Sequence, residues 1–160
     1  MPHPPAAISA RIQRLLRAEQ DGSGDPELLA RMPSGYAILG KFQPQPIRGC
    51  CMLLPEEVVP SPNELSPTAR ARFFSDLVLL GDAILEVTGA ERINYLVLCN
   101  QVPELHGHCV PRFAGEDPAL RLQGPFEAYD FAGAPVADPR GEHRELVERL
   151  RATLARLLAA

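Results

Sequence analysis

The stretch VPELHGHCVPRF (residues 102–113) places a carboxylate and two histidines at alternate positions between two prolines. Side chains of an extended strand alternate between its two faces, so Glu104, His106 and His108 are expected to share one face at intervals of roughly 7 Å. Imidazole is a nucleophile, a proton carrier and a metal ligand near neutral pH. Because the chain has four histidines and two of them lie here, this stretch is the first candidate for a catalytic or metal-binding site.

Three interpretations of the stretch are open. The histidines could be ordinary polar residues on a solvent-facing strand, although their apolar, proline-bounded surroundings argue against this. Glu104, His106 and His108 could form a two-histidine, one-carboxylate metal set, but alternate positions of one strand converge poorly on an ion. In the third interpretation, one neutral imidazole is the nucleophile at a phosphorus atom and the second histidine beside it donates a hydrogen bond to the phosphoryl oxygens.

The strands that must position these side chains can be recognised from short β-rich runs. GYAILGKF (35–42) and GCCMLLP (49–55) flank a turn-rich segment and predict a β-hairpin. RINYLVLCN (92–100) is followed closely by the histidine stretch, which favours an antiparallel pair. Gly107 leaves the opposite face of the histidine strand bare, so another element is expected to pack close behind it.

Helical periodicity predicts three helices around these strands. The clearest covers residues 66–89, with Ser66 as N-cap and Gly89 as the terminator. A shorter amphipathic helix is expected over residues 6–20, and a final one begins near residues 138–139. The Gly- and Pro-rich segment 114–140 is expected to be an ordered tail across the body of the domain.

Composition limits the class of protein. A chain of 160 residues, 46% hydrophobic and 22% charged, is expected to form one globular domain. A net charge of −4 favours no nucleic-acid partner. No apolar run is long enough for a membrane helix and the N-terminus lacks the apolar core of a signal peptide, so we expect a cytoplasmic protein with reduced cysteines.

The histidine stretch resembles the signature of the histidine triad (HIT) superfamily, in which three histidines alternate with apolar residues, often after Val-Pro and before Pro-Arg. RGCCMLLPEEVV resembles the family's strand that begins with Gly-His and ends with Pro, and RINYLVLCN resembles its Asn-bearing strand. The resemblance covers about residues 34–113. It implies an α+β fold: an antiparallel sheet of about five strands with a long packing helix and extra terminal helices.

The resemblance also implies an activity. In the family the central histidine attacks a phosphorus atom and forms a transient nucleotidyl-histidine, which implies that His106 is the nucleophile and His108 its phosphate-side partner. This chain departs from the family at two positions. Glu104 stands where the first histidine of the triad would be, as a modified catalytic group, and Cys50 replaces the histidine of the second strand.

Four further side chains are candidates for substrate binding. Asn94, Asn100 and Gln101 fall where the family places polar groups for ribose and phosphate, although each could equally be a local structural residue. Arg112 ends the histidine strand and could neutralise a phosphate, or be a solvated strand end. Other histidines, His3 and His143, are expected to be exposed bystanders.

Together these observations predict one HIT-like domain over residues 1–160, with a core at about 34–113, an N-terminal helix at 6–20 and a tail and helix at 114–159. The expected function is hydrolysis or transfer of a nucleotidyl or phosphoryl group from a phosphoanhydride, phosphoramidate or nucleotide sugar. A nucleotide-binding module with a decayed triad is the alternative, and a metal-binding protein the third. We expect a nucleotide or nucleotide conjugate as ligand, no cofactor, and a homodimer.

Overall fold

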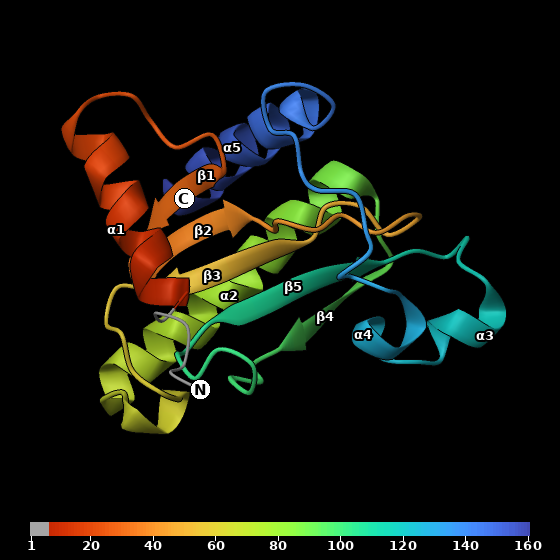
Figure 1. Ribbon diagram of the computed structural model, residues 1–160, viewed down its shortest axis with the longest axis horizontal. Coiled ribbons are helices and arrows are strands. Elements are labelled where there is room, and N and C mark those ends of the chain that lie inside the picture. Colours follow the sequence, from red (N-terminus) through yellow and green to blue (C-terminus); the bar gives the residue numbers. More distant parts are fainter. Residues whose placement is uncertain (1–6) are drawn as a thin grey trace.

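The computed structural model describes residues 7–160, which form one five-stranded antiparallel sheet with helices on both faces (Figure 1). The strand order is β1-β2-β3-β5-β4. The strands are β1 (Leu28–Met32), β2 (Gly35–Leu39), β3 (Cys51–Pro55), β4 (Arg92–Leu96) and β5 (Gly107–Arg112). The helices are α1 (Ala7–Gln20), α2 (Pro67–Thr88), α3 (Pro118–Arg121), α4 (Pro125–Ala128) and α5 (Arg144–Leu158), with a 3-10 turn at Pro62–Glu64. The α+β class and the five-stranded sheet predicted from the sequence are confirmed.

The edge strand β1 has no counterpart among the strands recognised in the sequence. Its residues LLARM include Ala and Arg, which have little β preference. β1 forms because the short turn after Met32 leads into β2, with which it pairs antiparallel. Tertiary pairing therefore extends the sheet upstream of residue 34, where the sequence resemblance begins.

Helices cover the two faces of the sheet in different ways. On one face, α2 and α5 enclose the main core, in which Phe73 and Leu150 pack in one cluster with Leu53 of β3. On the other face, α1 contributes Ile12 to a smaller cluster that includes Ile38 of β2. Figure 1 shows α1 in front of β2 and β3, with α2 behind the sheet. The histidines lie on the face that α1 covers only in part.

Helix α2 begins and ends where the sequence predicts. The Ser66 side chain accepts a hydrogen bond from the backbone N–H of Ala69, and Gly89 closes the helix with a left-handed φ of 71°. The helix also passes close behind the histidines. A Cβ atom on Gly107 would lie 2.6 Å from Leu77 Cδ1, so the absence of a side chain there permits the close packing expected from the sequence.

The connection between β4 and β5 is longer than the sequence suggests. β4 ends at Leu96 rather than near residue 100, and Cys99 has a left-handed φ of 54° that is incompatible with a strand. β5 begins only at Gly107, so Glu104 and His106 precede it. The backbone N–H of Leu105 donates to Val59 O over 2.7 Å, which fixes this segment outside the sheet.

The tail is ordered and crosses the body of the domain. The backbone N–H of Ala137 donates to Lys41 O, and that of Gln43 to Pro135 O. The last helix begins at Arg144 because residues 138–143 form a turn in which His143 Nδ1 accepts a hydrogen bond from the Asp138 N–H. His143 is buried, so its interpretation as an exposed bystander is wrong, whereas His3 lies outside the described residues.

Within residues 7–160, no helix combines the length and the apolar character required to cross a membrane.

Candidate active site

The two histidines of the motif lie side by side at the start of β5. Their ring centroids are 5.0 Å apart and the rings are nearly perpendicular. The Nδ1 atom of His106 lies 2.7 Å from the main-chain oxygen of Glu104. Because a carbonyl oxygen can only accept, Nδ1 carries the proton in this contact. Nε2 of His106 is therefore the ring nitrogen with a free lone pair when the imidazole is neutral.

His108 is held in the uncharged form by its surroundings. Burial, and then the neighbouring His106, lower its pKa from 6.5 to about 4. Its ring also meets the edge of Phe126 from α4, with centroids 5.3 Å apart. In this environment His108 is a neutral imidazole at pH 7 that can donate only its single N–H.

Glu104 does not line up beside the histidines as a catalytic carboxylate. Its two carboxylate oxygens accept hydrogen bonds from the backbone N–H and the hydroxyl of Ser9, over 2.9 and 3.1 Å. Ser9 lies in the first turn of α1, where backbone N–H groups have no partner within the helix. The Glu104 side chain thus attaches α1 to the sheet, while its main-chain oxygen orients His106.

Cys50 is an inert residue at the position where the family has a histidine. It is 4% exposed and packs in a small apolar cluster with Ile47 and Val110. Burial raises the pKa of its thiol to about 12, so it remains protonated at neutral pH. Cys109 is likewise buried, with its thiol donating to Leu77 O on the α2 side. Cys109 belongs to the main core between the sheet and α2.

Arg112 is buried and fully engaged, which corrects both sequence-based interpretations of this residue. It is 4% exposed. Nε bonds the Glu116 carboxylate, Nη1 donates to Asn94 Oδ1 and Gln123 O, and Nη2 contacts Leu120 O and Glu116. A guanidinium has five N–H donors, and these contacts account for all of them. Arg112 is therefore neither a solvated strand end nor a free phosphate ligand.

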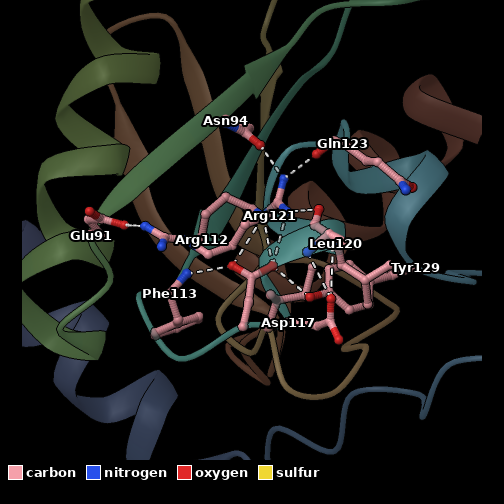
Figure 2. A network of polar contacts seen from close by, with 12 residues as sticks. Glu91, Asn94, Arg112, Phe113, Asp117, Leu120, Arg121, Gln123 and Tyr129 are labelled. Carbon is pink, nitrogen blue, oxygen red and sulfur yellow. Dashed lines mark hydrogen bonds and ion pairs between the residues drawn. The ribbon is translucent and has the colours of Figure 1, made fainter.

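Glu116 and Tyr129 complete this polar cluster, which Figure 2 shows with Arg112, Phe113 and Tyr129 labelled. The Glu116 carboxylate also accepts from the Phe113 N–H and the Tyr129 hydroxyl, each over 2.6 Å. Burial alone would raise the pKa of Glu116, but the hydrogen bonds from Arg112, Tyr129 and Phe113 lower it overall. The cluster ties the α3–α4 segment to the end of β5. Sequence reasoning missed it because nothing local distinguishes Glu116 from a surface loop acid.

The remaining candidate substrate-binding residues lie in two different parts of the structure. Asn100 and Gln101 are exposed in the bend that leads from β4 toward Glu104. Asn94 lies instead on β4 beside Arg112 and lines an open groove of about 880 Å³. This groove, here named the β4 groove, is lined by residues 92–96 of the edge strand and by Arg112, Pro118 and residues 121–125.

Several solved structures share the fold of this chain over most of its length. A histidine triad protein from Sinorhizobium meliloti 1021 is 24% identical and superposes with a TM-score of 0.66 over 86% of this chain and 93% of its own. The protein has the histidine triad fold. A hypothetical histidine triad nucleotide-binding protein from Sulfolobus tokodaii shares this fold at 16% identity and a TM-score of 0.62, over 88% and 91% of the two chains.

A third structure with this fold is a zinc-bound histidine triad family protein from Mycobacterium smegmatis, with 19% identity and a TM-score of 0.60 over 89% and 93% of the two chains. In the present histidine triad fold, no group of three His, Cys, Asp or Glu side chains among residues 7–160 is placed to hold a metal ion. No family model matches the sequence, and no curated protein shows significant similarity to it.

Proposed function

We propose that this protein is a nucleotidyl or phosphoryl hydrolase or transferase that works through a covalent histidine intermediate. Nε2 of His106 attacks the phosphorus atom and forms an N–P bond, while the bond from phosphorus to the leaving group breaks and the leaving group takes the electron pair. Water or another acceptor then attacks the same phosphorus and releases His106. The acceptor loses its proton to solvent.

The observation that carries this proposal is the 2.7 Å contact between His106 Nδ1 and Glu104 O. It selects the tautomer in which Nε2 is the nucleophile, and it holds the ring while the N–P bond forms. The same hydrogen bond stabilises the positive charge that develops on the imidazole in the attack.

His108 is proposed to act as a neutral hydrogen-bond donor to a phosphoryl oxygen. Its ring lies within 5.0 Å of the His106 ring, centroid to centroid, and a single N–H is sufficient for this task. Asn100 and Gln101 are proposed to contact the nucleotide from the bend before Glu104. The nucleotide class of ligand is supported by the name of the Sulfolobus tokodaii protein, which shares the fold.

Intact-protein mass spectrometry tests the proposal. The protein is mixed briefly with nucleoside phosphoramidates, dinucleoside polyphosphates and nucleotide sugars and quenched cold at alkaline pH, because phosphohistidine adducts are acid-labile. We expect a nucleotidyl mass shift that is absent in His106→Asn and retained in Cys50→Ala, the matched control for a thiol adduct. Circular dichroism of His106→Asn checks that the fold is intact.

Two outcomes would reject this mechanism. An adduct that persists in His106→Asn would place the nucleophile elsewhere. The absence of any adduct and of any turnover, together with ligand-induced thermal stabilisation, would identify a non-catalytic nucleotide-binding module. That alternative is supported by Glu104 and Cys50, since neither replaces the chemistry of the histidine that the family has at its position.

We also propose that the protein is a cytoplasmic homodimer. Phe74 and Val78 are one turn apart on α2, and their side chains are 40% and 49% exposed; Tyr95 on the edge strand β4 is 40% exposed. Apolar groups at this edge would be covered by a second copy that pairs along β4. Light scattering after size exclusion should give twice the mass of the chain, and Val78→Arg should give the monomer. A monomeric wild-type protein would exclude the dimer.

A further inference from the structure

We propose that a cleft between the turn after α1 and the start of α5 binds a small molecule that carries two linked phosphate groups. The cleft is open, has a volume of about 430 Å³, and is here named the β1 cleft. Residues 23–26 line it on one side, and Arg140, Arg144 and Arg151 line it on the other. The inference does not depend on the function proposed above, because the β1 cleft shares no residue with the histidine pair.

The β1 cleft lies at the opposite edge of the sheet from β4. In the strand order β1 and β4 are the two edge strands, and β2 and β3 separate β1 from β5, the strand of His108. Figure 1 shows the turn after α1 beside α5 at the β1 edge. A ligand in this cleft therefore contacts neither the histidines nor the edge at which the second copy is proposed to pair.

Arg151 joins the two sides of the β1 cleft and keeps its charge. Its Nε donates to Leu28 O over 2.8 Å, and its Nη2 donates to Pro26 O and Asp25 O over 3.2 and 3.3 Å. These partners are neutral main-chain oxygens, so they do not cancel the charge of the guanidinium. The contacts also fix its plane, in which Nη1 has two further N–H donors.

The acids that line the β1 cleft leave a surplus of positive charge. Asp25 is buried, and its carboxylate already accepts from Arg14 Nε and from the Glu27 N–H, each over 2.9 Å. Glu148 pairs with Arg144 at 3.9 Å, but the two side chains are 66% and 71% exposed, and such a pair is weak. Because Arg14 balances Asp25, the three lining arginines face the one remaining acid, Glu148, which leaves two net positive charges.

The turn after α1 leaves room for a ligand beside its backbone. Gly24 has a left-handed φ of 69°, and a Cβ atom on it would meet nothing within 4 Å. The backbone N–H of Gly24 donates to Ala18 O over 3.1 Å, which holds the turn against the end of α1. Ser23 is exposed beside it and adds a hydroxyl group that can donate to an anion.

The start of α5 adds to the attraction for an anion. The helix has 15 residues, and the residue before it, His143, makes no side-chain capping hydrogen bond. The dipole of a helix places partial positive charge at its N-terminus, and Arg144 lines the cleft from the first residue of this helix. Glu145 lies in the same turn, but it is exposed and is not among the residues that line the cleft.

Three guanidinium groups around one cleft suit phosphate better than carboxylate. A guanidinium donates two parallel hydrogen bonds to either group, but a tetrahedral phosphate offers oxygens in several directions, whereas a carboxylate offers them in one plane. The volume of about 430 Å³ is that of a small-molecule site. Two linked phosphates also carry enough negative charge to match the two net positive charges of the cleft.

Calorimetric titration with inorganic pyrophosphate tests the inference, at constant ionic strength because salt screens exposed charges. We expect saturable binding that is unchanged in His106→Asn. Arg140→Gln combined with Arg144→Gln should weaken it by at least about tenfold, since two charges near the phosphates are lost, and it leaves the contacts of Arg151 intact. Arg149→Gln is the matched control, because Arg149 is exposed on α5 outside the cleft, and it should bind as the wild type does.

Amide NMR signals locate the bound pyrophosphate. We expect the signals of Ser23, Gly24 and Arg144 to shift, in the wild type and in His106→Asn alike. No binding, shifts that are absent from these residues, or equal weakening in Arg149→Gln and in the double variant would overturn the site. Equally tight binding of malonate, a dicarboxylate, would overturn the phosphate class. Each of these failures leaves the adduct test of His106 unaffected, so the two proposals fail separately.

Discussion

The carboxylate of Glu104 binds both the backbone N–H and the hydroxyl of Ser9, a residue 95 positions away in the chain. This relationship gives the motif glutamate a role that its place in a histidine triad pattern does not suggest. The side chain attaches α1 to the segment that precedes β5, and the main-chain oxygen of the same residue holds His106. One residue thus couples the position of α1 to the orientation of the His106 ring.

Replacement of Glu104 by alanine should therefore loosen α1. Hydrogen bonds to a charged group contribute about 1.5–3 kcal/mol, so we expect Glu104→Ala to lower the free energy of unfolding in urea by about this amount. Hydrogen exchange should accelerate in α1 more than in α2. Glu57→Ala, which removes an exposed carboxylate, is the control and should have little effect. Equal stability of the two variants would contradict the attachment role.

The parts of this structure that could be predicted from the sequence are those encoded over short distances. Helix α2 follows from its apolar periodicity and from Ser66 and Gly89 at its ends, and the β2–β3 hairpin follows from two β-rich runs. The close packing behind the histidines follows from Gly107 alone. Each of these signals lies within the element that it specifies.

The contacts that define the candidate site join residues that are far apart in the sequence. The bond from Glu104 to Ser9 joins segments that no local pattern connects, and the burial of Arg112 depends on Glu116 and on a segment without regular periodicity. Residues 28–32 become a strand only because β2 is beside them. Alternation along an extended strand correctly placed His106 beside His108, but it could not show that β5 begins after His106.

The depressed pKa of His108 predicts a specific acid sensitivity. In the unfolded chain this histidine gains its proton near pH 6.5, and in the folded protein only near pH 4. Between these values the unfolded state binds more protons, so stability is complete above about 6.5 and is lost as the pH falls toward 4. The loss is at most roughly 3 kcal/mol, from the size of the shift.

Urea unfolding of the wild type and of His108→Asn at several pH values measures this contribution. We expect the wild type to lose stability relative to His108→Asn between pH 6.5 and 4, and the difference to be constant above pH 7. Glu116 and other acids are present in both proteins, so their titration cancels in the comparison. A difference that does not vary with pH would show that His108 titrates normally in the fold.

The buried pair of Arg112 and Glu116 predicts a large penalty for removing one charge. Both side chains are nearly inaccessible, at 4% and 0% exposed. Loss of one partner from such a pair typically costs about 3–5 kcal/mol because the other charge stays buried without compensation. We expect Glu116→Gln to lower the free energy of unfolding by several times the effect of Glu142→Gln, its exposed control.

The same variant should also disturb the histidine site, since Glu116 fastens the segment that carries Phe126. The imidazole NMR signals of His108 should shift in Glu116→Gln and stay unchanged in Glu142→Gln. A destabilised Glu116→Gln protein with unchanged His108 signals would show that the cluster supports the fold but does not position the α3–α4 segment over the site.

Gly107 gives a final prediction, because it lies between the two histidines and faces α2. An added Cβ would lie 2.6 Å from Leu77 Cδ1 and 3.4 Å from Phe73 Cζ. Such overpacking usually costs about 1–3 kcal/mol, and the strain would move β5 away from α2 together with His108. We expect Gly107→Ala to reduce both the free energy of unfolding and the rate of His106 adduct formation. Gly115→Ala is the control, because a Cβ there meets nothing within 4 Å, and it should preserve both the stability and the rate. A Gly107→Ala protein as stable and active as Gly115→Ala would mean that α2 can shift without moving the histidines.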